Sequence, residues 1–286
     1  MKLFTIAIIL TTVLLIAGGS LAYRRGIKWS SASSAATAVT SATAVGTGGR
    51  SAVIVELFTS EGCSSCPPAD QVLAQLENTQ PIAEAEIIAL SEHVDYWNYI
   101  GWTDPFSSAA FSARQQAYAD AFGNRDIYTP QMVVDGQAEF IGSHADKARA
   151  AISRTAQLPK AQVRLELAAN EQTRDVLAIG LTIRVEKLPP VTEGDVAEVL
   201  LAITESNLAS QVARGENAGR KLGHTAVVRE LRSLGPIANV NKPFSAETTA
   251  LLHKEWKRSE LRAVAFVQER NHKRMLGAAA LKLSAQ

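Results

Sequence analysis

Cys63 and Cys66 are the only cysteines in a chain of 286 residues, and two residues separate them. A run rich in β-branched residues, 53–58, precedes the pair, and Pro67 follows it directly. Such a run is typical of a buried strand. Proline is tolerated in the first turn of a helix, and the apolar residues beyond it recur at helical spacing. The segment therefore predicts a strand, a polar turn and a helix that begins at the cysteines.

This position gives the two cysteines distinct expected roles. A helix start carries partial positive charge and free N–H groups, which favour a thiolate over a thiol. Cys63 is therefore expected to attack a partner sulfur, and Cys66, one turn later, to resolve the mixed disulfide. A lone close pair indicates redox chemistry or metal ligation better than a stapled scaffold. A structural disulfide or a pair of inert thiols is the alternative.

The chain after the first helix continues to alternate between strand and helix patterns. Pro130 opens a run typical of a strand, and Asp135-Gly136 is a hairpin signal. The expected order is β-α-β-α-β-β-α. Its later elements are a strand at 86–91, a helix at 106–122, a hairpin whose return strand is 138–141, and a helix at 144–156.

This order, with its Cys-x-x-Cys pair and a proline before a hairpin, resembles the thioredoxin superfamily over about residues 51–156. The resemblance implies that Pro130 follows a cis peptide bond and lies beside the cysteines. Three segments are more closely similar to an exported bacterial family, domain of unknown function 1223, which is thioredoxin-like with an added β domain. They are 56–63 (Glu-Leu-Phe-Thr-Ser-Glu-Gly-Cys), 93–97 (His-Val-Asp-Tyr-Trp) and 214–217 (Arg-Gly-Glu-Asn).

Beyond Gln162 the apolar pattern changes to alternation in seven short runs, which predicts a sandwich. The expected fold class is an α/β thioredoxin-like domain, residues 51–158, followed by an all-β sandwich-like domain, residues 159–286. The second domain is expected to bind a partner or to shield the first.

The amino terminus reads as an export segment. Lys2 and an apolar run, 3–17, precede small residues, so residues 1–23 are expected to be a signal peptide or a membrane anchor. Arg24 and Arg25 follow the apolar run, and positive charge there hinders translocation. They weaken both the prediction of a cleaved signal peptide and the prediction that the following chain faces outward. Residues 24–50, rich in Ser, Ala and Thr, are expected to be a flexible linker. The sequence predicts an exported, periplasmic or extracytoplasmic protein, with cleavage and membrane anchoring both open.

Several residues near the cysteines are candidates for the site. Glu56, within the apolar strand, is either a proton shuttle or a solvent-facing strand residue. Pro130 would expose the backbone of Thr129, so that an extended peptide could pair with it. His93, with Asp95, either belongs to the site or caps a loop.

The aromatic segment 94–106 holds Trp97 and Trp102, which either line a binding groove or pack. Residues 214–220 are interpreted as a solvated turn.

These residues favour an exported thiol–disulfide oxidoreductase that acts on a protein thiol or disulfide partner. One alternative is a copper or other soft-metal-binding protein, with a ligand added by His93 or Met132. The other is a non-catalytic binding module. Two cysteines fall short of a closed zinc site, and neither a metal nor a cofactor is expected for the oxidoreductase. With 29 basic and 28 acidic residues, the net charge of +1 argues against nucleic acid as a partner.

Overall fold

The computed structural model describes residues 43–45, 49–172 and 176–283. The expected export segment, 1–23, and all of the expected linker except residues 43–45 and 49–50 lie outside these ranges. No helix in the described ranges combines the length and apolar character needed to cross a membrane.

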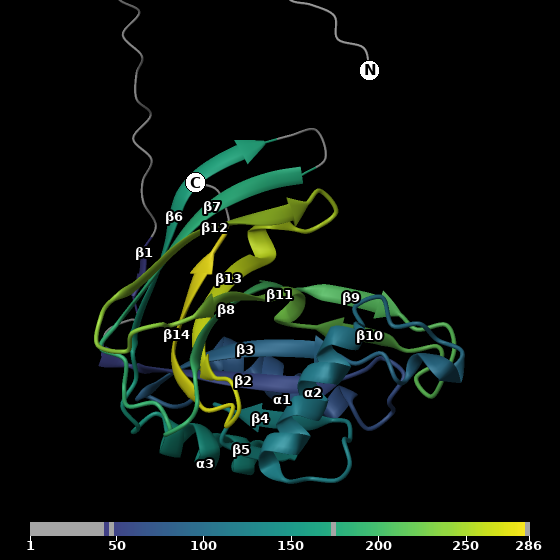
Figure 1. Cartoon of the computed structure of the whole chain (residues 1–286). Coiled ribbons are helices and arrows are strands. Elements are labelled where there is room, and N and C mark those ends of the chain that lie inside the picture. The colour runs from purple at the N-terminus through teal and green to yellow at the C-terminus, as the bar shows by residue number, and fades with distance from the viewer. Residues whose placement is uncertain (1–42, 46–48, 173–175, 284–286) are drawn as a thin grey trace, which may run out of the picture. The chain divides into compact units, whose positions relative to one another are not determined.

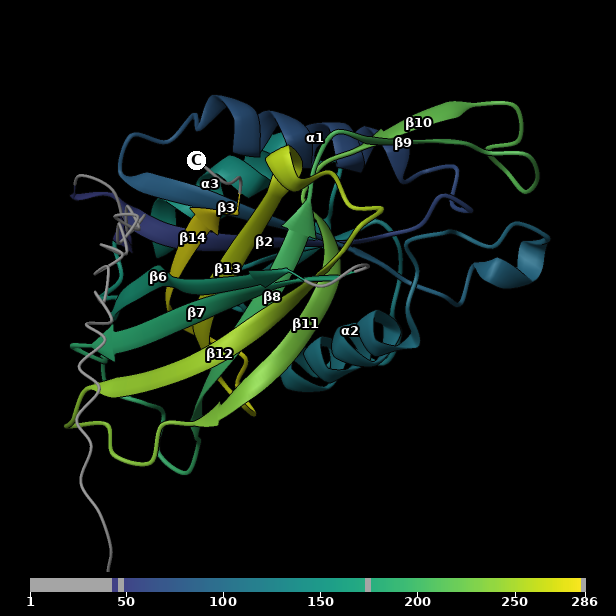
Figure 2. The same cartoon turned by 90° about the horizontal axis from the view of Figure 1, so that it is seen from above.

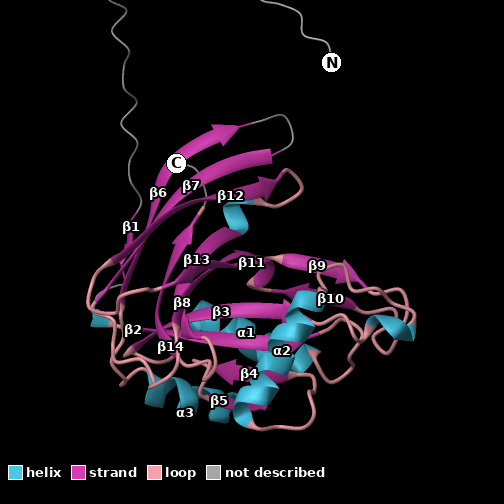
Figure 3. Ribbon diagram, viewed as in Figure 1, coloured by secondary structure: helices cyan, strands magenta, loops and turns pink. Residues whose placement is uncertain are grey.

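Strands outnumber helices in this structure (Figure 3). The helices are α1 (Pro67–Thr79), α2 (Ala109–Phe122) and α3 (Ala145–Thr155), with short 3-10 turns η2 (Asn98–Ile100) and η3 (Arg258–Glu260). The strands of the first half are β1 (Thr43–Val45), β2 (Ser51–Thr59), β3 (Ala85–His93), β4 (Gln131–Val134) and β5 (Ala138–Ile141). Those of the second half are β6 (Gln162–Gln172), β7 (Val176–Glu186), β8 (Ala197–Glu205), β9 (Leu208–Gln211), β10 (Lys221–His224), β11 (Val227–Pro236), β12 (Phe244–His253), β13 (Leu261–Glu269) and β14 (Met275–Lys282).

One mixed sheet of eight strands runs through both halves of the chain (Figure 1). Its order is β14-β13-β8-β11-β3-β2-β4-β5. β2 and β3 are parallel, with pairs from Ser51 and Ala85 to Thr59 and His93. A second sheet has the order β1-β6-β7-β12, and β9 pairs with β10 alone. The apolar faces of β6, β7 and β12 pack against β8, β13 and β14.

The expected fold class, an α/β thioredoxin-like domain followed by an all-β sandwich-like domain, is wrong. The described chain is mostly strand, and β2 to β5 share their sheet with four strands from the second half. The reason lies at β3, where Val227 of β11 pairs beside Ser91 and continues the sheet. A hydrophobic pattern predicts a strand but does not predict which strand pairs with it.

Local expectations within residues 51–156 are confirmed. The run 53–58 lies inside β2, and α1 begins at Pro67. Asp135 and Gly136 have φ values of 53° and 65° between β4 and β5, as the hairpin signal predicts.

The alternation of side chains along β2 divides the core into two faces. Val53, Val55 and Leu57 pack against α1 and α3. Ile54 packs on the opposite face with Phe111 of α2. Figure 2 accordingly shows α1 and α3 on one side of β2 and β3, with α2 on the other. A side chain of β2 can therefore approach α1 or α2, but not both.

Candidate functional site

A disulfide joins Cys63 to Cys66 where β2 leads into α1. The Cα atoms of the two residues are 5.4 Å apart, and Cys66 is the N-cap residue of α1. Because β2 and β3 are parallel, their carboxyl ends both reach this point. In parallel sheets, ligand sites form at this edge. Both cysteines are fully buried, so the sulfur atoms are shielded in this conformation.

The first turn of α1 surrounds the pair with polar groups. The backbone N–H groups of Ala69 and Asp70 donate to the carbonyl of Cys66 at 2.8 and 3.1 Å. The hydroxyl of Ser65 lies 3.3 Å from Cys63 Sγ. The pair thus stands at a helix start, the position from which the sequence analysis expects a thiolate to be favoured.

A turn between β9 and β10, residues 212–220, reaches the disulfide segment, and we name it the clasp. Asn217 Nδ2 donates to the carbonyls of Glu61 and Cys63, each at 2.9 Å. The carboxylate of Glu216 accepts the backbone N–H of Ser64 at 2.9 Å, and hydrogen bonds from Ser64 hold the pKa of Glu216 below its usual value. Most of residues 214–220 are exposed, as the interpretation of a solvated turn expects, but Asn217 is fully buried.

Glu61 connects the disulfide segment to two further elements. His224 Nε2, from β10, lies 2.9 Å from Glu61 Oε1. Trp102 Nε1 donates to Glu61 Oε2 at 2.8 Å. Trp102 therefore holds a residue of the cysteine turn.

His93, at the end of β3, forms a buried pair with Asp104. The Nδ1 atom of His93 is 2.7 Å from Asp104 Oδ2, which also accepts the backbone N–H of Glu61 at 2.8 Å. Burial alone lowers the pKa of His93, but the carboxylates of Asp104, Asp70 and Glu61 together raise that pKa above its ordinary value. Burial raises the pKa of Asp104, but the charge of His93 and the hydrogen bonds to the carboxylate outweigh burial and lower that pKa. The partner of His93 is thus Asp104, while Asp95 bonds to Ser112.

Asp70 lies one turn beyond Cys66 on α1. Thr59 Oγ1 donates to Asp70 Oδ1 at 2.9 Å. Burial of the carboxyl group raises the pKa of Asp70, although the charges of His93 and His224 oppose this. Thr59 and His93 are register partners in neighbouring parallel strands, so their side chains share the face that α1 covers.

The aromatic segment and the hairpin proline meet beside the cysteine turn. Trp97 Nε1 donates to Thr129 Oγ1 at 2.7 Å, and the Thr129–Pro130 bond is cis, as predicted. A Cβ added to Gly62 would lie 3.1 Å from Trp97 Cβ. One added to Gly142 would lie 3.0 Å from Ala69 Cβ and 3.5 Å from Pro130 Cβ. Gly142 therefore packs between Pro130 and the first turn of α1.

Glu56 is not brought to the cysteines. It is fully buried but belongs to the face of β2 that α2 covers, where Arg114 Nε donates to Glu56 Oε1 at 2.7 Å and Tyr118 donates to the other oxygen. Arg114 Nε is also 3.3 Å from Glu92 Oε1. Burial raises the pKa of Glu92 well above its ordinary value; Arg114 opposes this rise and Glu56 adds to it. The proton-shuttle role proposed for Glu56 has no contact here that would serve the disulfide.

Sequence reasoning missed most of the residues that surround the pair. These are Glu61, Asp70, Asp104, Asn217 and His224, all near or within the segments that carry the family resemblance. The polar residues inside those segments were one signal in the sequence that could have identified part of this set.

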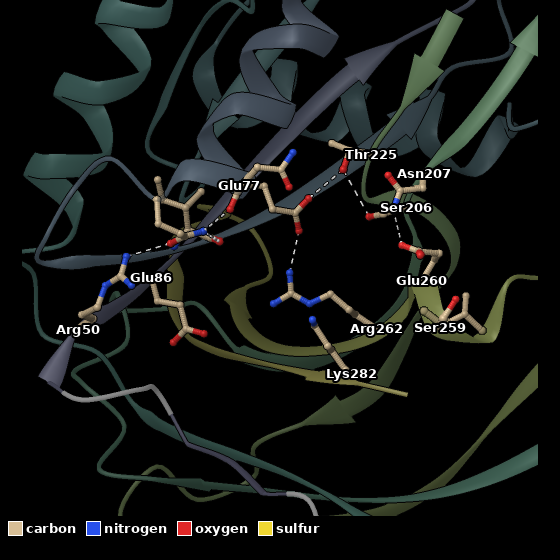
Figure 4. A pocket seen from close by; sticks show the side chains of 14 residues that line it. Arg50, Glu77, Glu86, Ser206, Asn207, Thr225, Ser259, Glu260, Arg262 and Lys282 are labelled. Carbon is tan, nitrogen blue, oxygen red and sulfur yellow. Dashed lines mark hydrogen bonds and ion pairs between the residues drawn. The ribbon is translucent and has the colours of Figure 1, made fainter. Parts of the chain in front are cut away.

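A polar cavity of about 420 Å³ lies apart from the disulfide, beside the last turns of α1 (Figure 4). Arg262 Nη1 lies 2.7 Å from Glu77 Oε1, and Thr225 donates to the other Glu77 oxygen at 3.2 Å. The cavity is lined by residues of both signs and includes neither cysteine.

Comparison with known proteins gives a family and a fold. The structure of protein AGR_C_4864 from Agrobacterium tumefaciens is similar, with 25% identity and a TM-score of 0.60, over 82% of this chain and 95% of that one. HBP35 of Porphyromonas gingivalis has 16% identity and a TM-score of 0.58, over 82% of this chain and 76% of that one, and shows the fold alone. No curated protein matches. The DUF1223 family model, described as a protein of unknown function, matches residues 54–268, and the chain therefore belongs to that family.

Proposed function

We propose that this chain carries out thiol–disulfide exchange with a protein partner at Cys63 and Cys66. The observation that carries the proposal is the disulfide itself, at a helix start and at the carboxyl ends of two parallel strands. An arrangement of this kind lowers the pKa of a thiol and so makes the thiolate available near neutral pH.

The exchange balances in two steps. A partner thiolate attacks Cys63 Sγ, the bond between the two cysteines breaks, and Cys66 leaves as a thiolate that takes a proton. A second partner thiol loses its proton and attacks the partner sulfur of the mixed disulfide, and Cys63 leaves as a thiolate. The partner is oxidised to a disulfide and the pair is reduced; the reverse sequence reduces a partner.

Exposed apolar side chains near the pair support a polypeptide as the partner. Tyr99 is 82% exposed, and the next residue, Ile100, packs on the cysteine turn at Gly62. Ile141 is 46% exposed and precedes Gly142, which packs against α1 and Pro130. Isolated apolar residues are common on surfaces, but these two are the chain neighbours of residues that pack on the cysteine turn and on α1.

The burial of both sulfur atoms requires a local opening before exchange. We propose that this opening breaks the contacts from the clasp to the backbone of the cysteine turn. The same burial supports the alternative of a non-catalytic binding module whose disulfide is only structural.

The proposal includes export, with an extracytoplasmic location and an amino-terminal segment that is either cleaved or retained as a membrane anchor. Disulfides persist mainly in oxidising compartments.

The reduction potential of the pair tests the proposal. The protein is equilibrated in glutathione buffers, and free thiols are counted by alkylation, which reports only this pair because the chain has no other cysteine. A potential between about −120 and −270 mV, with insulin reduction or RNase refolding lost in Cys63→Ser and Cys66→Ser, is expected. A potential below about −300 mV without turnover is the property of a structural disulfide and contradicts the proposal.

A further inference from the structure

Two buried histidine nitrogens behind the disulfide have no hydrogen-bond partner within the described part of the chain. They are Nε2 of His93 and Nδ1 of His224. His93 is fully buried and His224 is 6% exposed. Their ring centroids are 4.9 Å apart, with planes inclined by 76°. A buried polar atom without a partner is unfavourable because it has lost its hydrogen bonds to water, so two of them side by side point to a ligand.

The opposite nitrogen of each ring is held by a carboxylate. His93 Nδ1 is 2.7 Å from Asp104, and His224 Nε2 is 2.9 Å from Glu61. An imidazole that donates its N–H to a carboxylate presents the lone pair of its other nitrogen in a fixed direction. This carboxylate–histidine arrangement is the usual support of a histidine that binds a metal ion.

Charge around the two rings also favours a cation. Asp70, Glu61 and Asp104 contribute three carboxyl groups from α1, the cysteine turn and the aromatic segment. One nearby cation, Arg229 of β11, stacks over the Phe106 ring at 5.4 Å and pairs with Glu205 at 3.6 Å.

Asp70 is the candidate for a third ligand. One of its oxygens accepts from Thr59, which leaves Oδ2 available. Within the described residues, the ligand atoms of Asp70, His93 and His224 are not all within 4.8 Å of one another, so binding of an ion requires these side chains to move closer together.

A different cluster does meet that spacing but is occupied by protein contacts. Asp195, Glu269 and His272 lie within 4.8 Å of one another. The nitrogen Nδ1 of His272 is 2.8 Å from Asp195, and Arg274 pairs with Glu269 at 2.5 Å. The ligand atoms there already have partners, which makes this cluster a suitable control.

We propose that His93 Nε2 and His224 Nδ1, completed by Asp70, bind a first-row transition-metal ion of the zinc or copper class behind the Cys63–Cys66 disulfide. The proposal does not depend on thiol exchange, because the two histidine nitrogens have no partner within the described residues while the disulfide is closed.

Calorimetric titration of Zn²⁺ into the chelator-treated full chain, with its disulfide closed, tests the site. We expect one ion per chain, and at least about tenfold weaker binding in His93→Gln and in His224→Gln. His272→Gln should bind as the wild type does. Absence of binding to the wild type, unchanged binding in both variants, or loss of binding in His272→Gln would each overturn the proposal.

Histidine ring NMR of the wild type covers the case in which a variant does not fold. The chain has five histidines. Zn²⁺ should shift the ring signals of two buried ones and leave His272 unchanged. A shift confined to exposed histidines contradicts the site.

Discussion

Replacing Asn217 with alanine should release the cysteine turn. The side chain donates two buried hydrogen bonds, to the carbonyls of Glu61 and Cys63, each 2.9 Å long. A buried hydrogen bond contributes about 0.5–1.5 kcal/mol net, so the closed state loses about 1–3 kcal/mol. Since 1.4 kcal/mol is a factor of ten, the opening constant rises roughly 5- to 150-fold. Reduction of the disulfide should accelerate by the same factor, if opening precedes attack.

The assay follows thiol release from the folded protein in excess dithiothreitol, by alkylation at timed intervals. Asn124→Ala is a matched control, because it removes one half-buried amide hydrogen bond, 3.2 Å to Glu139, away from the cysteines. Urea unfolding of both variants separates local opening from a general loss of stability.

A reduction rate in Asn217→Ala within twofold of the wild type refutes the clasp as the barrier. So does an equal acceleration in Asn124→Ala, because the effect would then follow global stability.

Three further predictions concern the core. Arg114→Met leaves the buried carboxyl groups of Glu56 and Glu92 without their cation and should cost about 3–5 kcal/mol in urea unfolding; a loss below 1 kcal/mol contradicts the pairing. The pKa of Glu92 is raised above 4.5, so the folded state holds this proton more tightly than the unfolded state does, and stability falls as the pH rises above that value. Glu92→Gln should flatten this decline in the free energy of unfolding, measured by denaturation at pH 5 to 8. An unchanged slope argues against Glu92 as the cause. Gly136→Ala places a Cβ 1.8 Å from the carbonyl oxygen of Lys273, at a φ of 65°, and should lower the melting temperature by several degrees; an unchanged melting curve would show that the hairpin adapts.

The sequence predicted individual strands, helices and turns better than it predicted which strands pair with one another. The strand before Cys63, the helix from Pro67 and the Asp135-Gly136 turn depend on residues within a few positions of one another. The pairing of β3 with β11 depends on residues 136 positions apart, Ser91 and Val227. No local pattern specifies that pairing, and the predicted fold class was wrong for this reason.

The residues of the candidate site likewise divide into local ones, which the sequence predicted, and remote ones, which it did not. Trp97 bonds to Thr129, which precedes Pro130, and it packs at Gly62 beside Cys63; these residues belong to one contiguous segment. Asn217 and His224 reach the site through the strands β9 and β10. Glu56 faces the other side of the sheet because side chains alternate along β2. The sequence shows this alternation, but not which helix covers which face.

The distance along the chain between the cysteines and the clasp sets an order of events during folding. Cys63 and Cys66 are three positions apart and can meet as soon as the turn forms, whereas Asn217 lies 154 residues beyond Cys63. Contacts between remote residues require closure of long loops and form late. A folding catalyst would therefore meet the pair while it is still open, and the clasp, which arrives later, would seal whichever oxidation state that encounter left behind.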